Sequence, residues 1–137
     1  YCFRSVPGMC KVGKYRGNSS DDGIFISLGF KPRWFLVKDT TTTDAAQDWF
    51  IIDSARYKYN GSTSAGGTNG GTLEANDSTI EETQTANFGD APGVDFLSNG
   101  IKLRTNSGVI NNSSRTYIYI AMAEIGGNGT LPPIYGR

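Results

Sequence analysis

The chain has 137 residues, a length that suits one domain of ordinary size. Its 13 Lys and Arg balance its 13 Asp and Glu, so no net charge would draw it to nucleic acid or to an anionic membrane. It contains no His, which excludes Ser-His, Cys-His and His-metal chemistry within the chain. We therefore expect no nucleic-acid partner and no His-dependent site, and we predict no catalytic residue, metal or cofactor for this domain.

Short apolar or alternating runs follow one another along the chain and are separated by gaps rich in Gly, Asn, Asp and Pro. None of them keeps the 3.6-residue period of an amphipathic helix over three turns. The pattern predicts an all-β fold, an antiparallel β-sandwich of jelly-roll or lectin-like type with little or no helix. The expected strands cover residues 1–6, 12–16, 23–28, 34–38, 48–53, 94–98, 101–104 and 117–124.

Three of these runs are apolar at both odd and even positions, which is typical of strands buried in the middle of a sheet. They are residues 34–37, 49–52 and 117–123, and we expect them to form most of the core, with their rings inside and a polar exterior. Residues 101–104 alternate instead, as a strand with one solvated face does. Asn99-Gly100 is a tight-turn signal and predicts a hairpin that joins this strand to residues 94–97.

The domain boundaries are less clearly marked. We assign residues 1–11 to the end of an upstream module or a linker strand, residues 12–127 to the sandwich and residues 128–137 to a C-terminal tail. Cys2 and Cys10 flank a Pro-Gly turn and either form a disulfide or remain free thiols. No apolar run approaches the ~20 residues that a membrane-spanning helix needs, so we expect no membrane insertion.

Two short motifs contain groups that also occur in metal or catalytic sites, but each has a simpler structural explanation. Residues 18–22 offer several oxygen atoms, yet they lack the ligand pattern of a calcium loop, so we expect an Asx-type turn there. Asp53 and Arg56 stand three residues apart where a strand ends, and we expect a structural ion pair. The scattered carboxylates show no spacing that identifies a glycosidase.

Five segments occur in an order that carries a family resemblance: residues 13–19 (GKYRGNS), 29–38 (GFKPRWFLVK), 48–56 (DWFIIDSAR), 95–104 (DFLSNGIKLR) and 117–124 (YIYIAMAE). Together they resemble a C-terminal-type β domain of tailed-bacteriophage virion proteins, especially tail and head fibres. In that family the domain often follows a lectin-like sandwich that ends in a Val-Pro-Gly turn, which residues 6–8 resemble. The Gly-rich stretch at residues 62–71 departs from the family pattern, so its conformation does not follow from the resemblance.

The resemblance implies a non-enzymatic structural protein located in the virion, on a tail fibre or on the capsid surface. Such a domain would bind the host surface, neighbouring subunits or both, and would form a homo-oligomer, most often a trimer. Its partners would be other virion proteins and a host cell-surface glycan. Two alternatives remain open: a capsid decoration (cement) protein and a polysaccharide-degrading tailspike domain.

A contact surface for a glycan is expected beside the long polar loop at residues 60–72. Aromatic rings stack on sugar C–H faces, and Asn side chains hydrogen-bond sugar hydroxyls. Tyr57 and Tyr59 adjoin this loop, and Asn60 and Asn69 lie within it. These four residues are the predicted binding residues.

Overall fold

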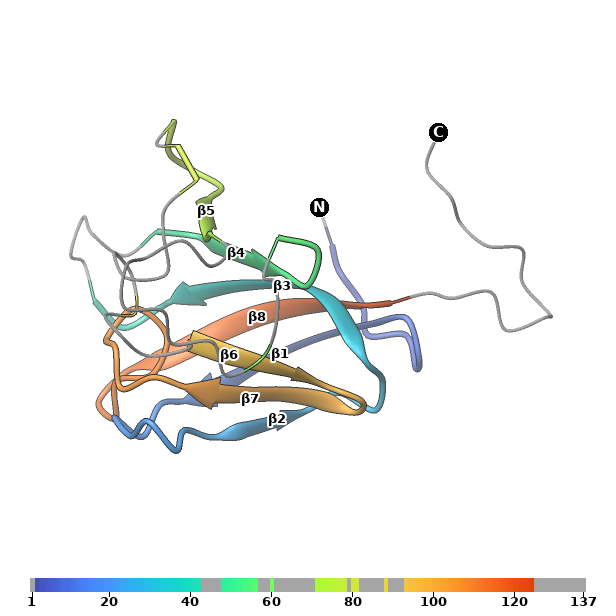
Figure 1. Ribbon diagram of the computed structural model, residues 1–137, viewed down its shortest axis with the longest axis horizontal. Coiled ribbons are helices and arrows are strands. Elements are labelled where there is room, and N and C mark those ends of the chain that lie inside the picture. The colour runs from blue at the N-terminus through green and yellow to red at the C-terminus, as the bar shows by residue number, and fades with distance from the viewer. Residues whose placement is uncertain are drawn as a thin grey trace, which may run out of the picture.

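A computed structural model describes residues 2–42, 48–56, 60, 71–78, 80–81, 88 and 93–124 of the chain. Within these residues the chain forms eight strands, all paired antiparallel, which confirms the predicted all-β sandwich (Figure 1). The strands are β1 (Cys10–Arg16), β2 (Phe25–Ser27), β3 (Pro32–Asp39), β4 (Phe50–Asp53), β5 (Leu73–Glu74), β6 (Gly93–Leu97), β7 (Gly100–Arg104) and β8 (Thr116–Ala123).

The strands are divided between a five-stranded sheet, in the order β1-β8-β3-β4-β5, and a three-stranded sheet, in the order β2-β7-β6. Figure 1 shows the larger sheet above the smaller one. The last strand, β8, lies between β1 and β3, as predicted for a strand that is apolar on both faces. Both edges of β8 are therefore hydrogen-bonded, and the larger sheet depends on it for its continuity.

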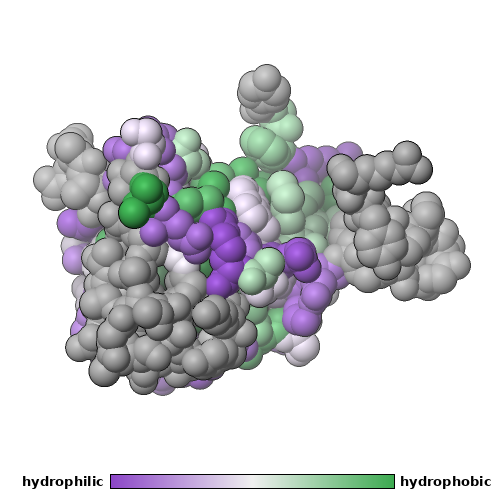
Figure 2. Space-filling view, turned by 45° about the horizontal axis from the view of Figure 1, so that its top comes forward, coloured by the Kyte–Doolittle hydropathy of each residue, from purple (hydrophilic) through white to green (hydrophobic). Residues whose placement is uncertain are grey.

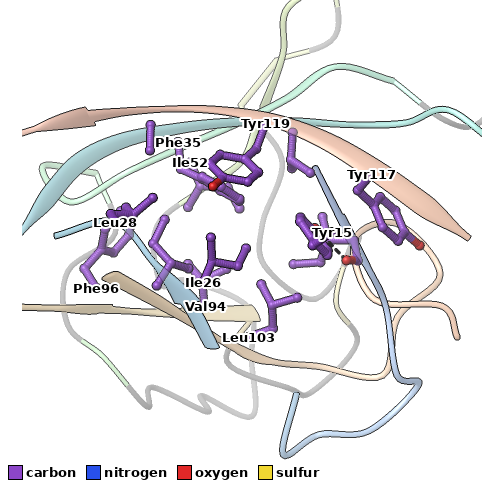
Figure 3. Close-up of a cluster of buried hydrophobic side chains, with 14 of the residues drawn as sticks. Tyr15, Ile26, Leu28, Phe35, Ile52, Val94, Phe96, Leu103, Tyr117 and Tyr119 are labelled. Carbon is purple, nitrogen blue, oxygen red and sulfur yellow. Dashed lines mark hydrogen bonds between the residues drawn. The ribbon is translucent and has the colours of Figure 1, made fainter. Parts of the chain in front are cut away.

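The core lies between the two sheets. Tyr119, Phe35 and Ile52 point from the larger sheet toward Val94 and Leu103 of the smaller one (Figure 3). Of the 18 buried apolar residues in the described part of the chain, eight come from the three runs that were expected to supply most of the core. That expectation was wrong, because a two-layer sandwich covers one face of each sheet and so buries only alternate residues of those runs.

The predicted hairpin is present. β6 and β7 pair from Gly93 opposite Arg104 to Leu97 opposite Gly100, with a turn at residues 98–99. Ile101 and Leu103 are buried, whereas Lys102 is partly exposed on the other side of the strand. The Asn99-Gly100 signal therefore identified the hairpin, and the alternation identified which side of β7 faces the core.

The N-terminal residues differ from the expected strand over residues 1–6. Within residues 2–9 only Val6 makes a β-bridge, to Cys10, across a turn in which Gly8 has a φ of 73°. Both cysteines are free thiols, and the Cys10 thiol donates a hydrogen bond to the Arg4 carbonyl (3.2 Å). β1 begins at Cys10, so residues 10 and 11, predicted to lie outside the sandwich, belong to it.

Two loops meet at one end of the sandwich, and the buried side chain of Asn111 joins them. Its amide nitrogen donates to Asn18 Oδ1 (2.9 Å), to the Ser20 carbonyl (2.9 Å) and to the Thr105 carbonyl (2.7 Å). Its amide oxygen accepts from the Asn18 backbone N–H (2.9 Å). A buried amide satisfied on both sides fixes the loop after β1 against the loop after β7.

Candidate contact surface on the outer face of the larger sheet

The predicted glycan surface falls mostly outside the described residues, which do not include Tyr57, Tyr59 and Asn69. Asn60 is described, and its side chain is engaged within the protein. Its amide nitrogen donates to the Phe96 carbonyl and its amide oxygen accepts from the Phe96 N–H, both at 2.8 Å. Asn60 therefore pairs with β6 as a neighbouring strand would, and the binding role of the four residues stays a prediction.

The turn at residues 18–22 is stabilised by its own side chains. Asn18 Oδ1 accepts the Ser20 N–H (3.1 Å), which is the predicted Asx-type turn, and the Ser20 hydroxyl accepts the Asp22 N–H (3.2 Å). Asp22 forms ion pairs with Lys102 (2.8 Å) and Arg104 (3.4 Å). Within the part of the chain that the structure describes, no three His, Cys, Asp or Glu side chains are grouped as metal ligands would be.

The predicted ion pair at the end of β4 is confirmed. Asp53 Oδ1 accepts the backbone N–H groups of Ala55 (3.0 Å) and Arg56 (2.9 Å), and Asp53 Oδ2 contacts the Arg56 guanidinium. Burial raises the pKa of Asp53, but the hydrogen bonds and the charge of Arg56 outweigh it and hold this pKa below its ordinary value of 3.8. The pair stabilises the turn that follows β4.

We expect Arg56→Gln to reduce the free energy of unfolding at neutral pH by about 1 kcal/mol, because it removes a charged partner from a partly buried carboxylate. A lowered folded-state pKa stabilises the fold above the unfolded value of 3.8. This contribution is lost as the pH falls below that value through the folded-state pKa. Urea unfolding of both proteins at neutral pH and at about pH 2.5 tests this, and a difference that persists undiminished in acid would contradict it.

A second polar cluster closes the core beneath the end of β3. The rings of Tyr15 and Tyr117 stack with their centroids 5.0 Å apart, and the Tyr15 hydroxyl donates to the Ile110 carbonyl (2.8 Å). Burial raises the pKa of Tyr15 well above its ordinary value. The buried carboxylate of Asp39 lies 3.3 Å from the Arg115 guanidinium. Asp39 Oδ1 accepts the Thr41 N–H (2.7 Å), whereas Oδ2 has no hydrogen-bond partner among the described residues and is held by the ion pair with Arg115 alone.

The outer face of the smaller sheet is charged. Lys102 and Arg104 point outward from β7, and Asp22 and Asp95 neutralise them, with Asp95 2.7 Å from the Arg104 guanidinium. Charged side chains dominate the described part of this face, although Asp95 is buried and Phe25, opposite Lys102, is 43% exposed. The outer face of the larger sheet differs from it in character.

The outer face of the larger sheet carries an apolar row across all five strands. The strand register places Val12 opposite Ile120, Ile120 opposite Leu36, Leu36 opposite Ile51 and Ile51 opposite Leu73. Each of these side chains is partly exposed. Directly opposed residues share a face, so the row is a continuous apolar band on the side away from the core.

Further apolar side chains widen this band. Met122 and Ile118 flank the row on β8 and are 42% and 37% exposed. Trp34 lies opposite Met122, and Trp49 lies on the side of the chain opposite the buried Phe50. Figure 2, with the top of Figure 1 turned forward, shows apolar side chains reaching the surface in its upper part.

A groove of about 570 Å³ runs over this band, and we refer to it as the outer groove. Both Trp residues of the chain line it, as does Phe3 from the N-terminal segment, which is 61% exposed. Side chains without polar atoms make up most of its wall. The lining residues are Phe3, Val12, Gly13, Trp34, Leu36, Trp49, Ile118, Tyr119, Ile120 and Met122.

The apolar even positions of residues 117–123 are the sequence feature that corresponds to this surface. On the sequence alone they predict a strand that is buried on both faces. In the structure only the odd positions, among them Tyr117 and Tyr119, face the core, and Ile118 and Met122 face outward. The expected polar exterior is therefore wrong for this sheet, and exposed apolar area of this kind marks a contact surface.

The outer groove lies in the region of the chain that a family model covers. Residues 1–125 match the model described as "Domain of unknown function (DUF7483)". The chain therefore belongs to this family. None of the curated proteins and none of the solved structures matches the chain. In the described residues there is no helix with the length and apolar character needed to cross a membrane.

Proposed function

We propose that this chain is a structural domain of a bacteriophage virion, on a tail fibre or another appendage, and that it works by binding other polypeptides rather than by catalysis. The apolar outer face of the larger sheet is the observation that supports a binding role. When another protein covers a band of exposed Trp, Leu, Ile and Met side chains, the burial of apolar area stabilises the complex. The sequence resemblance supports the virion as the place where this contact is made.

The chemistry of the outer groove favours a polypeptide partner over a glycan at this face. A glycan site needs several polar groups placed to hydrogen-bond the sugar hydroxyls, together with the aromatic platform. Trp34 and Trp49 could supply the platform, but Leu36, Ile120 and Met122 line the same groove and offer no hydrogen-bonding side-chain groups. Host-surface binding, if this domain performs it, would therefore use a different surface, such as the predicted loop at residues 60–72.

The location is tested by labelling purified particles with an antibody raised against this chain and viewing them by electron microscopy. Label on the tail supports the proposal. Label confined to the capsid surface supports a decoration protein instead and overturns the appendage role. Particles that bind no label, although the antibody recognises the denatured chain among their proteins, would place the domain in the interior and equally overturn it.

The contact role of the outer face is tested by Leu36→Glu, which puts a charge in the middle of the outer groove without touching the core. We expect incorporation of the chain into particles to fall at least tenfold, or about 1.4 kcal/mol, because an interface centre does not tolerate an unpaired charge. Lys14→Glu is the matched control, since Lys14 is exposed on the same face beyond the groove. An equal loss for both variants, or for neither, would contradict a role of the groove.

A further inference from the structure

The outer groove selects for an occupant of particular chemistry. Among the described residues that line it, polar side-chain atoms are few, so an occupant gains little from charge or from hydrogen-bonding groups and gains mainly from apolar area. Trp34 and Trp49 lie in its wall, and aromatic-lined grooves are the usual binding sites of Pro-containing segments, whose restricted backbone loses little entropy on binding. A short, uncharged, apolar segment that contains Pro would fit these requirements.

The chain carries one such segment outside the described residues. Residues 131–135 read Leu-Pro-Pro-Ile-Tyr and contain no charged side chain. They follow residues 125–130, Ile-Gly-Gly-Asn-Gly-Thr, whose Gly-Gly and Asn-Gly pairs are turn signals. The sequence therefore places an apolar, Pro-containing pentapeptide a short distance beyond β8.

The geometry allows this segment to return to the groove. β8 ends at Ala123, and Met122, its last outward residue, itself lines the groove. From Met122 to Ile118 the wall extends over four residues of strand, or about 13 Å. The six residues before Leu131 reach roughly 20 Å when extended, which exceeds that length. A reversal just after Glu124 would therefore lay residues 131–135 along β8 on its outer side.

We propose that residues 131–135 occupy the outer groove of the same chain. A pentapeptide buries too little area to bind strongly from free solution, but a short tether raises its effective concentration to the millimolar range. This favours the chain's own segment over that of a second copy. The role of residues 131–135 rests on the proposed function: they shield the outer face of the unassembled subunit and are displaced by the partner during assembly.

Both Trp residues line the groove, so their fluorescence reports its occupancy directly. In the full chain we compare a double variant, Leu131→Ser with Ile134→Ser, against the matched control Asn128→Ser. The double variant should shift Trp emission to longer wavelength and raise the acrylamide quenching constant about twofold or more, because the docked population falls from a majority to a minority. The control should match the unchanged protein. Equal quenching in all three proteins would overturn the proposal.

A dilution series separates the two possible sources of the segment. Quenching in the unchanged protein should be the same over a hundredfold range of protein concentration, since tethered binding does not depend on concentration. Quenching that rises on dilution would mean that a second copy supplies the segment, which overturns binding within one chain. Particle incorporation of Leu36→Glu is measured separately, so a failure of this inference and a failure of the proposed function give different results.

Discussion

Replacing Asn111 by Asp should destabilise the protein by about 3–5 kcal/mol, one of the two largest effects that we expect from a single substitution. Asn111 is fully buried, and its amide nitrogen donates to the side chain of Asn18 and to the carbonyls of Ser20 and Thr105. A carboxylate of the same shape has no hydrogen to donate, so three acceptors would face a buried negative charge. Urea unfolding followed by Trp fluorescence measures the loss.

The neighbouring residue provides a matched control. Asn112 is partly exposed, and its side-chain oxygen accepts hydrogen bonds from the Ser114 N–H (2.9 Å) and from the Ser114 hydroxyl (2.7 Å). Asp at this position keeps both acceptor roles, so Asn112→Asp should change the free energy of unfolding by less than about 0.5 kcal/mol. Similar stabilities for Asn111→Asp and Asn112→Asp would show that the buried amide does not hold the two loops together.

The role of Asn111 illustrates what the sequence could not reveal. Asn111 lies in a polar stretch that reads as an ordinary loop, and its partners Asn18 and Ser20 are more than 90 residues away along the chain. Local periodicity carries no information about contacts at that separation. The local features were predictable for the opposite reason, because the Asx turn at Asn18 and the pair of Asp53 with Arg56 depend on residues two or three positions apart.

The fold class was predictable because strands and tight turns are each specified by residues that are only a few positions apart. The alternation of residues 101–104 and the Asn99-Gly100 turn were sufficient to identify β6 and β7 as a hairpin. Which face of β8 would be covered was not predictable, since both faces are apolar and a sequence does not state how many layers will form. The structure resolves this: Tyr117 is fully buried in the core and Ile120 lines the outer groove.

Replacing Gly17 by Ala should destabilise the protein by about 1–3 kcal/mol, because Gly17 lies too close to the backbone of Asn111 and Asn112 to leave room for a methyl group. Gly17 follows β1, and its N–H donates to the Arg115 carbonyl (3.3 Å). A Cβ atom at this position would lie 2.5 Å from the carbonyl carbon of Asn111 and 2.7 Å from the backbone nitrogen of Asn112. Both are backbone atoms, so the two loops would have to move apart, and urea unfolding should report the loss.

Gly108→Ala tests whether the effect comes from this contact or from the loss of a glycine in general. Gly108 lies in the loop that contains Asn111, but the nearest atom to a Cβ there is the Arg115 guanidinium, at 3.6 Å. A methyl group therefore fits. Because Ala lowers the conformational entropy of the unfolded chain, Gly108→Ala should stabilise the protein by a few tenths of a kcal/mol, up to about 1 kcal/mol. If Gly17→Ala is no less stable than Gly108→Ala, the loops are not packed as closely as the structure places them. A loss at Gly17 alone, together with the loss at Asn111, would show that one hydrogen-bonded contact holds this end of the sandwich closed.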